Sequence, residues 1–186
     1  GGEVRWVAPG PDGELDVDVL AELAPTARMI IMCSPSNPTG LVLPTETLHR
    51  VAEIVAANPL LLLVSDEAYS TIVFDDLEFV SAGTLAEIRE QTVVVGTFSK
   101  SFAMTGWRLG YAIAPAPLAA EINLVHRTIN GSLNTVVQDA GREALRTPDA
   151  ELAEQARSYQ RRRDMVVERL SAIPNVSVAR PTGAFY

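Results

Sequence analysis

Apolar residues gather in short, uninterrupted runs along the first two-thirds of the chain, and helical patterns lie between them. The runs are VRWVA, MIIMC, LLLLV and TVVVG, at residues 4–8, 29–33, 60–64 and 92–96. The last three runs show no alternation with polar residues, which predicts strands buried on both faces, as in a parallel sheet. Helical patterns occupy residues 16–24, 45–57 and 82–90. This alternation predicts an α/β fold: a mostly parallel sheet with flanking helices and right-handed crossovers.

The remaining segments extend this prediction. Thr45 is expected to cap the helix that it begins. The run LGYAIA follows the last buried strand so closely that it predicts a strand returning antiparallel. Three more helices are predicted over 115–128, 134–146 and 150–170. Arg163 falls on the apolar stripe of the last helix, but the segment RRRD at 161–164 is interpreted as a solvated face without a ligand.

The chain is predicted to divide at Thr147 and Pro148, where a turn signal separates two helical patterns. Residues 1–147 would form a large domain and residues 148–186 the beginning of a small α+β domain. The sequence begins Gly-Gly without Met and ends in PTGAFY, which is typical of the start of a strand. We therefore expect an internal portion of a longer protein, with part of the large domain preceding it.

Composition narrows the classes of function. The chain has 186 residues, 47% of them hydrophobic and 20% charged, as expected for a globular protein. A formal net charge of −8 argues against a nucleic-acid partner. No apolar run approaches the length of a membrane span, so no membrane partner is expected. A single cysteine, Cys33, excludes an internal disulfide framework and indicates a cytoplasmic location.

Polar residues that could take part in catalysis or binding follow each buried run. The candidates are Asn37 after the first run, Asp66 and Tyr69 after the second, Thr97, Ser99 and Lys100 after the third, and Arg108 eight residues later. Ligands of open α/β sheets bind beyond the carboxyl ends of the strands, so these side chains are expected to share one rim. Lys100 is the only lysine of the chain, every other basic side chain being Arg or His. The sequence therefore predicts a binding site centred on Lys100.

Three segments carry a family resemblance. SNPTG, SDEAYS and TFSKSFAMTGWRLGYAIAP, in this order and at these separations, resemble the signature segments of fold-type I pyridoxal-phosphate-dependent aminotransferases of class I/II. The resemblance runs along essentially the whole chain, from the opening GG to the closing PTGAFY. It implies a cofactor-binding large domain and pyridoxal 5'-phosphate as the cofactor. It also implies that the peptide bond between Asn37 and Pro38 is cis.

The resemblance assigns catalytic roles to three residues. Lys100 would form a Schiff base with the cofactor aldehyde and then move the substrate proton as base and acid. Asp66 would pair with the pyridine nitrogen, which keeps the ring protonated and able to accept electrons. Tyr69, together with Asn37, would hydrogen-bond the phenolic oxygen of the ring.

The remaining roles concern the phosphate. Arg108 would bind it with two parallel hydrogen bonds, a geometry that lysine does not offer. Thr97 stands where the family commonly has serine, and its hydroxyl is retained for the same contact. Ser99 is a second candidate hydroxyl.

The function implied is transfer of an amino group between an amino acid and a 2-keto acid, in a protein that is a homodimer at full length. Two alternatives share these segments: a related pyridoxal-phosphate lyase or synthase, and a non-catalytic ligand-binding domain of a transcription regulator. A P-loop nucleotide hydrolase is disfavoured. Gly96 lies four residues before Lys100, and Ser99 rather than glycine precedes the lysine.

Overall fold

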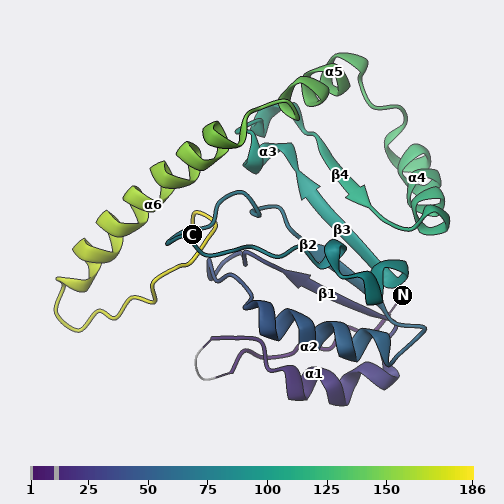
Figure 1. Cartoon of the computed structure of the whole chain (residues 1–186), viewed down its shortest axis with the longest axis horizontal. Helices are drawn as coiled ribbons and strands as arrows, with labels where there is room; N and C mark the ends of the chain where they lie inside the picture. The colour runs from purple at the N-terminus through teal and green to yellow at the C-terminus, as the bar shows by residue number, and fades with distance from the viewer. Residues whose placement is uncertain (1, 11–12) are drawn as a thin grey trace.

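The computed structural model describes residues 2–10 and 13–186, which fold around a four-stranded sheet (Figure 1). The strands, in spatial as well as chain order, are β1 (Met29–Cys33), β2 (Leu62–Asp66), β3 (Thr92–Thr97) and β4 (Gly110–Ile113). β1, β2 and β3 run parallel, and β4 returns antiparallel to β3. The predicted α/β class, the mostly parallel sheet and the antiparallel return are confirmed.

The register of the strands aligns their carboxyl ends. Cys33 lies opposite Asp66, and Asp66 lies opposite Val95 in the next strand. Two residues further on, Thr97 lies opposite Gly110. Because paired residues of a sheet point to the same side, Cys33, Asp66 and Val95 lie on one face, and Thr97 follows on that face.

Six α-helices and four 3₁₀-helices connect and extend the sheet in the described residues. The α-helices are α1 (Val17–Leu23), α2 (Thr45–Ala56), α3 (Phe98–Ser101), α4 (Ala116–Asn130), α5 (Thr135–Ala144) and α6 (Asp149–Ser171). The 3₁₀-helices are η1 (Ala24–Thr26), η2 (Ala82–Thr84), η3 (Ala86–Gln91) and η4 (Thr105–Trp107). Asp16 caps α1 by accepting a hydrogen bond from the Val19 amide, and Asn134 caps α5 in the same way.

The hydrophobic core lies between one face of the sheet and the helices α1, α2 and η3 (Figure 1). Its buried members are Leu20, Ala24, Ile30, Leu48, Val51, Ala52, Val55, Leu61, Leu63, Ala82, Leu85 and Ile88. The opposite face of β1 is not covered, since the side chains of Met29 and Ile31 are 49% and 72% exposed. The prediction that every buried run is covered on both faces is therefore wrong for β1.

Two other local predictions are wrong. The helix expected over 82–90 is replaced by η2 and η3. The Ser81 hydroxyl there accepts a hydrogen bond from the Gly83 amide, which favours a tight turn. Thr45 is the first residue of α2 rather than its cap; Pro44 holds the cap position without a side-chain hydrogen bond.

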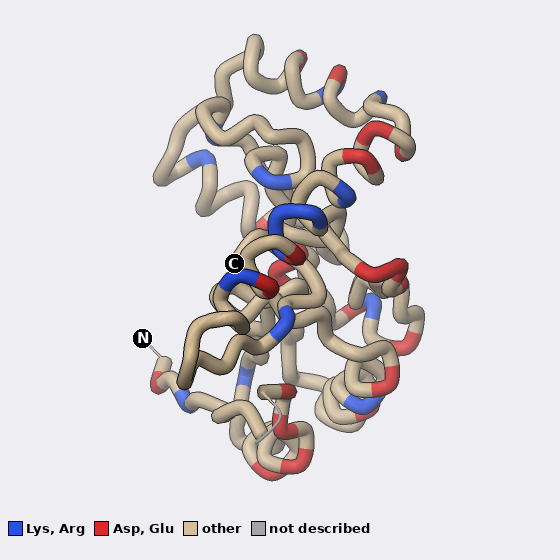
Figure 2. The backbone as a smooth tube through the Cα atoms, turned by 90° about the vertical axis from the view of Figure 1, so that its left-hand side faces the viewer, with Lys and Arg blue, Asp and Glu red and all other residues tan. Residues whose placement is uncertain are grey.

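The predicted solvated face of α6 is wrong at one position. Arg161 and Arg162 are exposed, but Arg163 is buried and its guanidinium lies 4.8 Å from the centre of the Phe74 ring. Arg163 forms an ion pair with Asp75 at 2.7 Å and donates to the carbonyl of Pro181. Basic and acidic segments lie side by side near the C-terminus (Figure 2). The contacts of Arg163 join α6 to the segments that contain Asp75 and Pro181.

None of the helices within residues 2–10 and 13–186 combines the length and the apolar character that a membrane crossing requires. No group of three or more His, Cys, Asp and Glu side chains is arranged to hold a metal ion there. The division of the chain at residue 148 stays a prediction, and α6 begins immediately after it.

Candidate active site

The loops after β1 and β2 hold the last six residues of the chain between them. The amides of Thr182 and Gly183 both donate to the carbonyl of Gly40, at 2.9 and 2.7 Å. On the other side, the Ala184 amide donates to the carbonyl of Ile72 at 2.8 Å. The two glycines permit this close approach. A Cβ on Gly40 would lie 2.7 Å from the Pro181 side chain, and one on Gly183 would lie 2.9 Å from the Ile72 carbonyl oxygen.

Lys100 lies in α3, directly after β3. The Thr97 hydroxyl caps this short helix by accepting a hydrogen bond from the Ser99 amide, and Gln155 of α6 donates to the Lys100 carbonyl. The Lys100 amine faces two aromatic rings: Nζ is 5.0 Å from the ring centre of Phe185 and 5.8 Å from that of Tyr69. Within residues 2–10 and 13–186 it makes no ion pair or hydrogen bond. The amine is therefore available for chemistry.

A phenol and an amide meet at the hydroxyl of Tyr186. The hydroxyls of Tyr69 and Tyr186 are 2.9 Å apart, and the Asn37 side-chain amide donates to the same Tyr186 oxygen at 3.2 Å. The peptide bond between Asn37 and Pro38 is cis, as predicted. Burial raises the pKa of Tyr69, and its hydrogen bond with Tyr186 raises it further. Asn37 and Tyr69 thus converge on one phenolic oxygen.

Asp66 ends β2 three residues before Tyr69. One of its carboxylate oxygens accepts a hydrogen bond from the Ala68 amide at 3.0 Å. The other oxygen has no hydrogen-bond partner in the described part of the chain. Next to it on β1, burial raises the pKa of the Cys33 thiol, and the charge of Asp66 adds to this effect, although the Asn37 backbone opposes it. Asp66 therefore offers an unpaired negative charge on the same face of the sheet as Thr97.

The three candidate phosphate contacts surround the turn from β3 to β4. The Thr97 hydroxyl is 3.3 Å from the carbonyl of Leu109, to which it donates, and Ser99 is buried. Arg108 is exposed and adopts a left-handed backbone conformation, with φ of 53° and ψ of 45°. Its guanidinium donates to the Thr105 carbonyl at 3.1 Å. This hydrogen bond leaves most of the guanidinium donors free.

The sequence did not single out Glu67, which is buried on the helix-covered side of the sheet. Its Oε1 accepts hydrogen bonds from the Ser65 hydroxyl and the Ala82 amide, both at 3.0 Å. Burial raises the pKa of this carboxyl despite these hydrogen bonds. The folded protein therefore favours the protonated form of Glu67 more than the unfolded chain does.

We expect Glu67→Gln to remove a pH dependence of stability. A raised folded-state pKa contributes stability at pH values below the ordinary glutamate pKa, and this contribution is lost as the pH rises through the folded-state value. Glutamine keeps both hydrogen bonds, because both end on one oxygen. Urea unfolding of both proteins from pH 4 upward should show stability falling for the native chain relative to Glu67→Gln. Parallel pH profiles would contradict this expectation.

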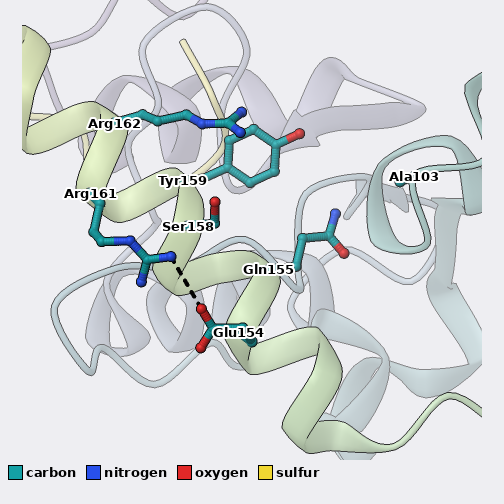
Figure 3. Close-up of a pocket in the computed structure, with 7 residues that line it drawn as sticks. All are labelled: Ala103, Glu154, Gln155, Ser158, Tyr159, Arg161 and Arg162. Atoms are coloured by element: carbon teal, nitrogen blue, oxygen red, sulfur yellow. Dashed lines mark hydrogen bonds and ion pairs between the residues drawn. The ribbon is translucent and has the colours of Figure 1, made fainter.

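An open hollow of about 340 Å³ lies along α6 (Figure 3). It is lined by Ala103, Glu154, Gln155, Ser158, Tyr159, Arg161 and Arg162. Glu154 pairs with Arg161 at 3.1 Å, and the Arg162 guanidinium lies 5.4 Å from the centre of the Tyr159 ring. Tyr159 in turn stacks against Phe185, with ring centres 5.6 Å apart. Aromatic stacking therefore connects this hollow with the lysine.

Sequence reasoning missed Phe185 and Tyr186 as residues of the site. It interpreted PTGAFY only as the beginning of a strand. The two adjacent aromatic residues were the available signal, but Tyr186 is separated in the chain by 149 residues from Asn37 and by 117 residues from Tyr69. The fold and the site together define an α/β protein with a lysine amine at the carboxyl edge of its sheet that has no ion pair with any described residue.

Comparison with known proteins identifies the family. The family pattern "Aminotransferase class I and II" matches residues 1–186. The aspartate aminotransferase of Pinus pinaster is 39% identical over 89% of this chain and 34% of its own length. The arginine–pyruvate transaminase of Pseudomonas aeruginosa is 39% identical over 91% of this chain and 42% of its own. A double mutant of Thermus thermophilus aspartate aminotransferase matches in structure with a TM-score of 0.90 and 36% identity, over 99% of this chain and 48% of that one.

The chain belongs to the class I and II aminotransferase family. It spans less than half the length of the curated relatives that it matches. Members of this family are transaminases that use pyridoxal phosphate.

Proposed function

We propose that this chain carries the central part of a pyridoxal-phosphate-dependent aminotransferase, which moves an amino group between an amino acid and a 2-keto acid. The observation that carries the proposal is the Lys100 amine. It faces the rings of Tyr69 and Phe185 and has no charged partner in the described part of the chain. A lysine kept for solubility would lie in solvent, whereas a lysine kept for covalent chemistry needs an accessible amine beside a ring-binding surface.

The residues present fit the cofactor. Pyridoxal phosphate is a phenol-like ring with an oxygen beside its aldehyde, and the structure contains a phenol in a corresponding environment. The Tyr186 hydroxyl stands in for the cofactor's phenolic oxygen by accepting from Asn37 and sharing a hydrogen bond with Tyr69. The free oxygen of Asp66 suits a protonated ring nitrogen, and the free donors of Arg108 suit a phosphate.

Each side chain of the proposed site then has its own role. When bound, the cofactor supplies an aldehyde for covalent capture of amines and a ring that accepts electrons. Asp66 holds a proton on the ring nitrogen by its negative charge. Tyr69 and Asn37 orient the ring through its oxygen, and Arg108 binds the phosphate with help from the hydroxyls of Thr97 and Ser99. The free Lys100 amine would move the proton at the substrate α-carbon, first as base and then as acid.

The substrates are proposed only as a class. Named relatives act on chemically different amino donors, aspartate in one case and arginine with pyruvate in another. We propose a small amino acid and a 2-keto acid as partners, as the family implies. We also propose a homodimer at full length, a cytoplasmic location in keeping with the single cysteine, and a role in amino-acid biosynthesis.

Covalent capture tests this function. The protein that carries this chain is incubated with pyridoxal phosphate, reduced with borohydride and mapped by peptide mass spectrometry. We expect one adduct, on Lys100, and loss of that adduct in Lys100→Arg, which keeps the charge but offers no amine. Because the chain has no other lysine, no second lysine side chain within it competes for the cofactor aldehyde. No adduct on Lys100 in the native protein would refute the proposal.

A further inference from the structure

We propose that Gln155 is a positioning residue for Lys100. Its side chain fixes the backbone of the lysine to α6, and the same helix is held to the loop that follows Tyr69. The consequence for catalysis rests on the proposed function: α6 then sets where the lysine amine lies relative to the Tyr69 phenol.

The segment that carries Lys100 is short. α3 has four residues, and the chain turns two residues after it, at Ala103, whose φ of 53° is left-handed. The last carbonyls of a helix have no partner within the helix and need donors from elsewhere. The Gln155 side-chain amide donates to the carbonyl of Lys100 at 3.1 Å. Gln155 therefore fixes the peptide group that follows the lysine side chain.

One side of α6 contacts both the lysine segment and the surroundings of Tyr69. Gln155, Tyr159 and Arg163 follow one another at intervals of four residues, so they lie along this side. Tyr159 packs against the buried cluster that includes Tyr69 and Phe74. From Gln155 to Arg163 the helix rises about 12 Å. This part of α6 therefore spans the distance between the lysine segment and the loop after Tyr69.

The far end of this side of α6 is fixed at Asp75, which directly follows Phe74. The Arg163 guanidinium pairs with the Asp75 carboxylate at 2.7 Å. Gln160 binds the same residue twice: its nitrogen donates to the carboxylate at 3.2 Å, and its oxygen accepts from the Asp75 backbone amide at 3.0 Å. Arg163 and Phe74 are buried. Gln155 thus ties the lysine to a helix that is itself held in place.

The rate of proton transfer depends steeply on where the lysine amine lies. A misplacement of about 1 Å can cost roughly a hundredfold in rate. Without Gln155, Lys100 would still be joined to β3, so we expect a smaller displacement and a loss of about tenfold. Covalent capture of the cofactor needs only an accessible amine and should be affected much less.

The first measurement tests the contact in the apoprotein. Gln155→Met removes the donor and keeps a side chain of similar length. Gln138→Met is the matched control, because Gln138 of α5 also donates to a backbone carbonyl, that of Leu133 at 2.9 Å. Amide hydrogen exchange is followed by mass spectrometry on peptides that cover residues 98–104. We expect exchange there to be about fivefold faster in Gln155→Met and unchanged in Gln138→Met.

The second measurement follows proton movement in the loaded protein. The native protein is incubated in D₂O with an equimolar mixture of natural L-amino acids, and mass spectrometry identifies the one whose α-hydrogen exchanges fastest. That amino acid is then used for every variant. We expect its α-hydrogen to exchange about tenfold more slowly with Gln155→Met, while the yield of the Lys100 adduct after borohydride reduction stays within twofold of native. Gln138→Met should match the native protein in both properties.

The outcomes separate the role of Gln155 from the proposed function. Unchanged amide exchange over residues 98–104 in Gln155→Met would overturn the role of Gln155, and so would α-hydrogen exchange at the native rate. Equal changes in Gln155→Met and Gln138→Met would point to general loosening and overturn it as well. No Lys100 adduct in the native protein, or no α-hydrogen exchange with any amino acid, would instead refute the proposed function.

Discussion

Asp66→Asn is expected to slow amino-group transfer on the order of 10²–10³-fold while leaving the Lys100 adduct in place. Asparagine has nearly the shape of aspartate and can still accept from the Ala68 amide, but it carries no charge. Without that charge the ring nitrogen loses its proton, and the electrons released at the substrate α-carbon are less stabilised. Lys100 is untouched, so covalent capture should survive. Single-turnover kinetics and borohydride mapping measure the two properties separately.

Asp139→Asn is the matched control for this experiment. Asp139 lies on α5 and is exposed, in a loose ion pair with Arg142 at 3.6 Å. We expect its transfer rate to equal that of the native protein. A loss of less than tenfold in Asp66→Asn would argue against a charged contact with the ring nitrogen. Loss of the adduct itself would show that Asp66 is needed for binding rather than for the chemical step.

Arg163→Met is expected to lower the free energy of unfolding by about 2–3 kcal/mol. Methionine replaces the buried stem but not the ion pair with Asp75, the hydrogen bond to Pro181 or the contact with the Phe74 ring. The loss stays below that of a fully buried pair because the Asp75 side chain is 38% exposed and keeps Arg180 at 3.4 Å. Urea unfolding at pH 7 measures the difference.

Arg162→Met provides the comparison, since Arg162 is the exposed neighbour on the same helix and lies over Tyr159. Its effect should stay within about 0.5 kcal/mol. The Arg163 guanidinium also holds the pKa of Asp75 below its ordinary value. The stability that the ion pair between Arg163 and Asp75 contributes is present above the unfolded-state pKa of Asp75. It disappears as the pH falls through the folded-state pKa. The difference in stability between the two variants should therefore become smaller as the pH falls below 4. Equal effects at neutral pH would show that burial of Arg163 contributes little.

The sheet and the lysine-centred site could be predicted because both depend on local order in the sequence. Each buried run ends in a chemically distinctive residue, and parallel strands bring such ends together whatever the surrounding detail. Asp66, Tyr69 and Lys100 were found in this way. The roles assigned to them remain predictions that the experiments above address.

The parts that escaped prediction depend on contacts between distant segments. Arg163 follows two exposed arginines and differs from them only because Asp75 and Pro181 meet it from elsewhere in the chain. The position of Tyr186 depends on Asn37 in a similar way. The exposed face of β1 was not predicted either. An apolar run shows that a strand can be buried, but it does not show which segment covers the strand.

The contact between Gly40 and Gly183 has a practical meaning for anyone who wishes to redirect the specificity of this protein. Randomised libraries often include loop glycines, but a side chain at either position would push the closing segment away from the loop that carries Asn37. Such variants would displace Asn37, which is proposed to contact the cofactor, before any new substrate could be selected. Both glycines are therefore best left unchanged in such libraries.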